Sequence, residues 1–369
     1  MAIELMHQDK VVAVIRDDGF CSVLLPRFMP FNLLLDETDN TFIRLKNLER
    51  FYYWCATRAL TLERSGAKDF LLSCGIQNAK TDKQRAEAAL RCHGLSLGDC
   101  FWLREAGESI SYSQINIFDN PSSGEFVDVV LRDRGMIVRN TGLIPEGSTL
   151  SQKNYMPNVW LRCQGHTYLL KEGSPDEVES ELLASRIARC FAVDQVLYEP
   201  TDFEDRRVTR SELITTKDKS IVFVPEMVPY LIRENKKLWD LVSEQDPYGY
   251  HMMNIIDYLV GNTDRHARNW GFWINNENNV PEKLFPLMDF NRCFRSYDSI
   301  EGAQCYTYKE EMPQKTAAIL GVQAVGLNQI HSLPESLQEA FSDLNSLRQT
   351  HLELMFSKRL DILLEAQNI

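Results

Sequence analysis

Residues 261–270 read GNTDRHARNW and gather charged and amide side chains directly behind an apolar helical run. The apolar residues of that run are Met252, Ile255, Ile256 and Leu259. Their helical spacing predicts a helix that ends where the loop begins. The separation of five residues between Asp264 and Asn269 is also common in loops that only cap a helix. Other motifs of the chain therefore decide whether this loop carries chemistry.

The length and composition of the chain limit the classes of protein to consider. Its 369 residues are 44% hydrophobic and 10% aromatic, as in an ordinary globular protein. A single core stops growing well below this length, so we expect two or three structural units. The formal net charge of -12 opposes a broad surface that neutralises phosphates. Nucleic acid is therefore not expected as a direct substrate.

Nine cysteines are spread along the chain without a CxxC pair or a histidine at metal spacing. This usage is typical of reduced thiols in a cytoplasmic protein. The first ten residues lack the order of basic and apolar residues found in a signal peptide, and no apolar run is long enough to cross a bilayer. We therefore expect a cytoplasmic protein without a membrane partner.

The first turn-rich break in the chain is NPSSGEF, residues 120–126, and we place a domain boundary there. Before it, residues 10–35 read as a β-hairpin and residues 43–74 have helical periodicity. We therefore expect an α/β extension over residues 1–125.

A run of short strands ends at Lys171, and a capped helix begins directly after it. Ser174 stands at the N-cap and Glu177 at the third helical position, which together form a capping box. The chain becomes mostly helical further on. We expect a unit of residues 126–230 and a mostly helical unit of residues 231–369, and the predicted fold class is α+β.

Phosphoryl transfer from ATP is the chemistry that these residue types fit. It needs a carboxylate beside the attacking hydroxyl and oxygen ligands for a Mg²⁺ ion that bridges the phosphates. Protein kinases supply an aspartate base and an asparagine five residues later from one loop behind a helix. Asp264 and Asn269 have this separation. Asp289, in LFPLMDF, follows a short apolar strand, where kinases place a second metal ligand.

Lys171 and the helix behind it supply the other half of a nucleotide site. In kinases the strand lysine contacts the α- and β-phosphates, and a glutamate of the next helix holds it. We predict Glu181 for this role. Glu179 remains an alternative. It lies four residues before Leu183, which places it on the packed face of the helix.

Two further assignments concern adenine and the base. Kinases bind adenine through backbone groups of the strand that links their lobes, and VPEMVPY, residues 224–230, is the candidate segment. Glu226 and Val228 would present the backbone acceptor and donor there. His266 is predicted to orient the loop through a hydrogen bond, because Asp264 already fills the role of base.

Taken together, the residues from about 145 to the end resemble the HipA-like family of bacterial serine/threonine kinases. The resemblance rests on GNTDRHARNWGF as catalytic loop, on PLMDF as metal motif, and on YLLKEG followed by ESELLASRIAR as lysine and helix. The region before residue 125, including LSLGDCFWLREAGESISYSQINIFDN, is similar to an N-terminal extension in a branch of that family from Gram-positive bacteria. Nearly the full length is covered.

This resemblance implies a bilobal protein-kinase-like fold that uses ATP and Mg²⁺. Asp264 would be the base, Asn269 and Asp289 would bind Mg²⁺, and Lys171 would contact the phosphates. The resemblance also implies a toxin that phosphorylates serine or threonine in a protein substrate. A small DNA-binding antitoxin would be its partner.

The chain departs from the family pattern at the loop that should cover the phosphates. The family has a glycine-containing loop ending in Pro-Lys, whereas this chain reads STLSQKNYMPNVW, with Asn158 in place of the lysine. Without glycine the backbone approaches phosphates less closely. The hydroxyls of Ser148, Thr149 and Ser151 are predicted to lie near the γ-phosphate and to be sites of autophosphorylation.

Two alternative functions stay open on the sequence. Phosphoinositide kinases also use an Asp-Arg-His-x-x-Asn loop, but an acidic chain without a basic membrane-facing run disfavours an anionic lipid substrate. A pseudokinase or nucleotide-binding regulatory module is favoured by the missing glycines. The presence of all four polar residues at their expected places opposes it: Lys171, Asp264, Asn269 and Asp289.

Overall fold

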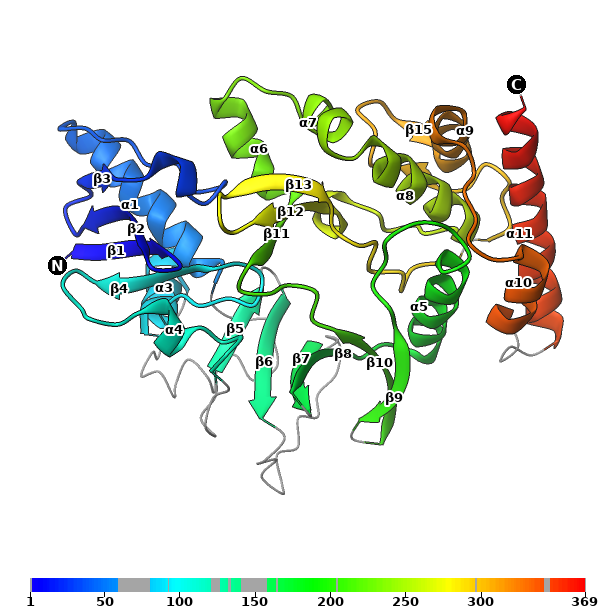
Figure 1. Ribbon diagram of the computed structural model, residues 1–369, viewed down its shortest axis with the longest axis horizontal. Coiled ribbons are helices and arrows are strands. Elements are labelled where there is room, and N and C mark those ends of the chain that lie inside the picture. Colours follow the sequence, from blue (N-terminus) through cyan, green and yellow to red (C-terminus); the bar gives the residue numbers. More distant parts are fainter. Residues whose placement is uncertain are drawn as a thin grey trace.

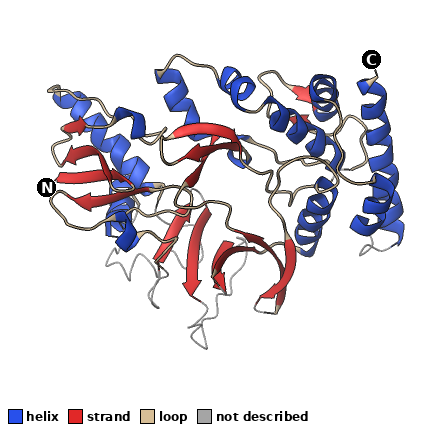
Figure 2. Ribbon diagram, viewed as in Figure 1, coloured by secondary structure: helices blue, strands red, loops and turns tan. Residues whose placement is uncertain are grey.

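The computed structural model describes residues 2–58, 80–91, 93–120, 127–131, 134–140, 158–163, 165–203, 205–295, 297–341 and 346–368. Three assemblies of secondary structure follow one another along the chain (Figure 1). A four-stranded sheet with its helices comes first, a six-stranded sheet follows, and a small sheet with most of the helices forms the C-terminal part (Figure 2).

The N-terminal assembly is a four-stranded antiparallel sheet covered by helices. Its strands are β1 (Ala2–His7), β2 (Lys10–Arg16), β3 (Cys21–Val23) and β4 (Phe101–Glu105), in the order β3-β2-β1-β4. Its helices are α1 (Thr41–Ala56), α3 (Asp82–Arg91) and the short α4 (Tyr112–Ile115), with the 3-10 turn η1 (Pro26–Phe28). Val12 and Ile15 of β2 pack with Phe51 and Trp54 of α1 in its core. The predicted hairpin is β2 and β3, while β1 was not predicted.

The six-stranded sheet runs in the order β5-β6-β7-β8-β10-β9. Its strands are β5 (Val127–Leu131), β6 (Arg134–Asn140), β7 (Asn158–Cys163), β8 (His166–Lys171), β9 (Glu199–Phe203) and β10 (Arg206–Glu212). Helix α5 (Pro175–Ala188) lies between β8 and β9 in the chain and contacts β10. It begins at the predicted capping box, because the Glu177 carboxylate accepts hydrogen bonds from both the backbone and the hydroxyl of Ser174, at 3.0 and 2.9 Å.

The C-terminal assembly contains a three-stranded sheet and most of the helices. The strands are β11 (Lys219–Phe223), β12 (Gly271–Asn275) and β13 (Val280–Leu284), and β14 (Gln304–Cys305) pairs with β15 (Met312–Pro313). The helices are α6 (Val224–Arg233), α7 (Leu238–Gln245), α8 (Pro247–Val260), η2 (Ala267–Asn269), α9 (Gln314–Val325), α10 (Leu333–Phe341) and α11 (Ser346–Gln367). Helix α8 is buried along most of its length and packs on α9, so it forms the axis of this assembly.

The sheets divide the chain at residues 213–218 rather than at the predicted boundary of 230. Strand β11 pairs with β12, which follows the loop at 261–270, so β11 belongs to the C-terminal assembly. The predicted break at 120–126 falls mainly outside the described residues. Among those residues, no helix combines the length and the apolarity that a membrane crossing requires.

The expected extended segment at residues 224–230 is wrong, because these residues form the start of α6. Pro225 stands in the first turn of this helix, where a missing N–H costs nothing. The carboxylate of Glu226 accepts the backbone N–H of Phe223 at 3.3 Å, as a residue at the third helical position does. Glu226 and Val228 therefore cannot offer the backbone of an extended strand to adenine.

Gly261 ends α8 with a φ of +62°, a left-handed conformation that favours glycine. A Cβ atom at this position would lie 2.6 Å from Cδ2 of the buried Tyr297. Conformation and space thus both require glycine here. The predicted helix end is confirmed, and it directs the chain into the polar loop.

Candidate active site

Arg265 anchors the polar loop to the C-terminal core. It is buried, and its guanidinium makes two bonds to the Asp257 carboxylate of α8, at 2.8 and 3.1 Å. It also donates to the carbonyls of Asn269 and Met288, at 2.9 and 2.6 Å. Burial disfavours its charge, but Asp257 outweighs that cost and raises the pKa of Arg265 above its ordinary value. One side chain thus fixes both the loop and the segment that leads to Asp289.

The three predicted residues of the loop itself are held by short-range hydrogen bonds. The Asn269 amide nitrogen donates to the carbonyl of Asp264 at 2.9 Å. The Asp264 carboxylate lies 3.9 Å from Nε2 of His266, and both side chains are 44% exposed. Nδ1 of His266 accepts the backbone N–H of Arg268 at 3.2 Å, which in a neutral ring leaves the proton on Nε2, towards Asp264. This geometry fits the predicted orienting role of His266.

Lys171 joins Glu181 and Asp289 in one buried cluster. Its ammonium lies 2.7 Å from the Glu181 carboxylate and 2.5 Å from that of Asp289. The second oxygen of Glu181 accepts the hydroxyl of Thr209 at 2.7 Å, so both its oxygens are engaged. Glu179, the alternative partner, instead pairs with Arg348 at 2.7 Å. The structure therefore selects Glu181 as the carboxylate that holds Lys171.

Asp289 reaches this cluster from a backbone conformation that side chains rarely adopt. Its φ is +63°, in the left-handed region, which aspartate tolerates better than most residues. Its backbone N–H donates to the hydroxyl of Tyr198 at 3.1 Å. The surrounding burial raises the pKa of Tyr198, so this hydroxyl stays neutral. A conformation of this kind at a polar site is typical of functional residues.

A second ion pair joins α5 to the segment behind Asp289. Glu177 lies one helical turn before Glu181, and its carboxylate is 2.5 Å from Arg295 and 3.5 Å from Arg292. Burial raises the pKa of Glu177, but hydrogen bonds from Ser174 and the charges of Arg295 and Arg292 outweigh it, so the pKa falls below its ordinary value.

Together the two connections close a ring of contacts through α5 and residues 289–295. Lys171 connects Glu181 to Asp289, and Arg295 connects Glu177 to the same segment. We call this the ion-pair ring. It fixes where α5 sits relative to Asp289. From the sequence, Glu177 is predicted only as part of the helix cap and Arg295 has no predicted role, because a contact across 118 residues leaves no local pattern.

Arg295→Ala should lower the free energy of unfolding by about 1 kcal/mol, since the pair has one buried and one partly exposed partner. Arg292→Ala is the matched control and should cost less, because its nitrogen is 3.5 Å away. Urea unfolding measures both. The pKa of Glu177 is lowered in the folded protein, so this stabilisation is present above the unfolded pKa and lost as the pH falls through the folded one. Equal losses in the two variants at neutral pH would contradict the assignment.

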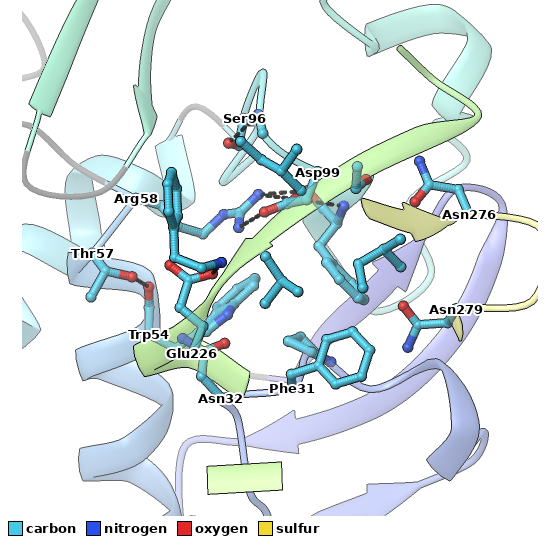
Figure 3. Close-up of a pocket in the computed structure, with 18 residues that line it drawn as sticks. Phe31, Asn32, Trp54, Thr57, Arg58, Ser96, Asp99, Glu226, Asn276 and Asn279 are labelled. Atoms are coloured by element: carbon cyan, nitrogen blue, oxygen red, sulfur yellow. Dashed lines mark hydrogen bonds and ion pairs between the residues drawn. The ribbon is translucent and has the colours of Figure 1, made fainter. Parts of the chain in front are cut away.

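Three of the predicted nucleotide-binding residues cannot be placed, and two others lie away from the candidate active site. Ser148, Thr149 and Ser151 lie outside the described residues. Glu226, from the N-terminal turn of α6, lines a different pocket, shared with Trp54 of α1, with Arg58 just after that helix, and with the turn between β12 and β13 (Figure 3). Val228 is 37% exposed on α6.

A divalent cation would find two oxygen ligands at this site. The Asn269 amide nitrogen is committed to the Asp264 carbonyl, so the amide oxygen is its group for a cation. Asp289 supplies a carboxylate, and hard oxygen donors suit Mg²⁺. In the described part of the chain, no three His, Cys, Asp or Glu side chains gather as a metal site. The residues present therefore fit a Mg²⁺ ion that takes its other ligands from phosphates and water.

Comparison with solved structures identifies the fold. The chain is similar to HipA in the complex of the Shewanella oneidensis MR-1 toxin–antitoxin system HipA, HipB and its operator DNA. The TM-score is 0.53 at 11% identity, and the match covers 100% of this chain and 99% of that chain. The Helicobacter pylori proinflammatory kinase CtkA also matches, with a TM-score of 0.47 and 14% identity over 57% of this chain and 93% of that chain.

No protein-family model and no curated protein matches the chain. At 11% identity, the likeness to HipA shows the fold alone. It confirms the predicted mixed α and β fold of the HipA type, while the Gram-positive branch stays a prediction.

Proposed function

We propose that this protein is an ATP- and Mg²⁺-dependent protein kinase that phosphorylates serine or threonine. The observation that carries the proposal is the Lys171 cluster. The ammonium of a strand lysine has two carboxylates within 2.7 Å. One comes from a glutamate on the next helix, and the other from an aspartate 118 residues after the lysine. Protein kinases use this set of residues, in this chain order, to hold the nucleotide phosphates. The loop with the partly exposed Asp264 and the buried Asn269 adds the remaining groups.

In this reaction, the oxygen of the substrate hydroxyl attacks the γ-phosphorus of ATP, and the bond to the β,γ-bridging oxygen breaks to release ADP. Asp264 accepts the hydroxyl proton, and its 44% exposure leaves room for a protein substrate. Lys171 binds the phosphates while Glu181 holds it in place. Asn269 and Asp289 would hold a Mg²⁺ ion, which would supply positive charge to the phosphates.

The adenine contact belongs, in this proposal, to residues 213–218. This segment links the six-stranded sheet to β11. It begins at the end of β10, which pairs with the strand that carries Lys171. The backbone of Leu213 is tied to β8 by a hydrogen bond to the Thr167 carbonyl of 2.8 Å. A backbone segment that leaves the sheet next to the lysine strand is the position expected of an adenine-binding linker, and its second half closes as a turn between Thr216 and Lys219.

We further propose that the kinase is a toxin restrained by a small DNA-binding antitoxin. The support is the full-length likeness in fold to HipA, which stands in a complex with HipB and operator DNA. A phosphoinositide substrate is disfavoured by the net charge of -12. The alternative of a pseudokinase keeps one supporting observation, the absence of glycine between Thr149 and Trp160.

The test incubates purified protein with γ-labelled ATP, Mg²⁺ and a bacterial lysate, beside the Asp264→Asn variant and beside phosphoinositide vesicles. Label on lysate proteins at serine or threonine, absent from the variant, supports the kinase. A wild-type protein that binds MgATP but labels nothing is a pseudokinase. Label confined to the vesicles would assign a lipid kinase instead.

A further inference from the structure

A cavity lies on the side of α5 that is turned away from the ion-pair ring. It has a volume of about 450 Å³ and is formed by α5, the β9–β10 hairpin and α10, neighbours in Figure 1. Buried aliphatic side chains form its floor: Val178, Leu182, Leu183 and Ala340. A helix turns by about 100° per residue, which places Leu182 and Leu183 about 100° and 200° around the helix from Glu181. We call this cavity the α5 groove.

Arginines line the rim of the α5 groove. Arg206 and Arg207 are exposed at the start of β10, and Arg206 remains 64% exposed although it pairs with Glu172 at 3.2 Å. Arg186 of α5 is the third, and its guanidinium also donates to the Ala340 carbonyl at 3.3 Å. The one carboxylate among the described lining residues, Glu179, is already paired with Arg348. In a chain with a net charge of -12, the groove is thus a local site of positive charge over an apolar floor.

We propose that the α5 groove binds a peptide segment that combines an apolar side chain with neighbouring carboxylates or a phosphate. The aliphatic floor would bury the side chain, and the arginines would pair with the anions. Among the lining residues that the structure describes, there is no aromatic ring on which a base could stack, which disfavours a nucleotide. Three arginines offer few contacts to an extended polyanion such as nucleic acid.

The groove shares two of its walls with the candidate active site. Helix α5 carries Glu181, and β10 carries Thr209, two residues beyond Arg207. The Thr209 hydroxyl donates the 2.7 Å hydrogen bond to the Glu181 carboxylate. A peptide that contacts both α5 and β10 holds them together and so stabilises the pair of Glu181 with Lys171. This second part rests on the proposed function. By linkage, peptide and MgATP would then raise each other's affinity by the same factor.

The binding test uses a fluorescein-labelled peptide, EDEFLEDE, and measures its anisotropy without nucleotide. Arg206→Glu combined with Arg207→Glu should weaken binding about tenfold or more, the scale of one lost charge-assisted contact. Both side chains are exposed, so this variant should fold. Arg233→Glu, an exposed reversal on α6, is the matched control and should bind like wild type. The peptide EDEGGEDE should also bind at least about tenfold more weakly.

Two results would overturn the docking site: no binding of EDEFLEDE, or equal binding by the double variant or by the glycine peptide. Calorimetry with a MgATP analogue then tests the coupling. We expect saturating peptide to raise analogue affinity about fivefold or more in the wild type, and to have no effect in the double variant. Peptide binding that leaves analogue affinity unchanged overturns the coupling. A protein that binds the peptide but no analogue contradicts the proposed function and leaves the docking site standing.

Discussion

Asp289→Ala is expected to abolish Mg²⁺-dependent nucleotide binding while the protein stays folded. The substitution removes one of the two oxygen ligands proposed for the cation, and it also takes from Lys171 the carboxylate at 2.5 Å. The loss of a buried, hydrogen-bonded charge of this kind weakens binding by about 100-fold or more. The fold should survive because Lys171 keeps its bond to Glu181, so no buried charge is left alone.

Calorimetric titration with MgATP measures this effect, and thermal unfolding reports on the fold. Asp298→Ala is a suitable control, because Asp298 follows in the same stretch of chain and its side chain is 87% exposed. The control should bind MgATP like the wild type. Tight MgATP binding by Asp289→Ala would refute the metal assignment and leave Asp289 as a structural partner of Lys171.

Asp264→Asn is expected to slow phosphoryl transfer about 100-fold or more, the scale of a lost general base, while ATP affinity changes only a few-fold. Among the described residues, the charged group paired with this carboxylate is His266, at 3.9 Å, and the side chain is 44% exposed, so its exchange for an amide should leave the packing intact. ATP is held, in the proposed mechanism, by Lys171 and the metal ligands. Turnover and binding should therefore separate in this variant.

Single-turnover rates with labelled ATP, together with calorimetric ATP binding, make this comparison. Glu277→Gln, at an exposed position in the turn between β12 and β13, controls for the loss of one carboxylate and should transfer phosphate at the wild-type rate. If the wild type transfers phosphate and Asp264→Asn matches it, residues 261–270 do not contain the base. The role of the loop would then be structural: through Arg265 it is bound to Asp257 of α8 in the C-terminal core.

The sequence predicted most where local chemistry determines local structure. The helix start at Ser174 and Glu177 and the helix end at Gly261 are read from capping rules that need only a few neighbouring residues. The meeting of Lys171 with Asp289 was predicted only by analogy with kinases. A contact across 118 residues depends on how the assemblies pack, which no local pattern encodes.

The errors have the same physical origin. Residues 224–230 contain two valines and two prolines and suggest an extended segment, yet Pro225 and Glu226 are also good residues for the first turn of a helix. The tertiary context decides between the two. The importance of Arg265 was missed for a related reason. An arginine between an aspartate and a histidine suggests a solvated charge, and only its burial against Asp257 reveals an anchor.

Position 261 shows how a survey of random substitutions could mislead. Every side chain at this glycine meets both an unfavourable backbone angle and the ring of Tyr297. The position would therefore be as intolerant as Asp264, although glycine offers the reaction no chemical group. The two kinds of damage differ in their cellular signature. Variants at 261 should lower the amount of folded protein, whereas Asp264→Asn should leave abundance normal and remove only the activity.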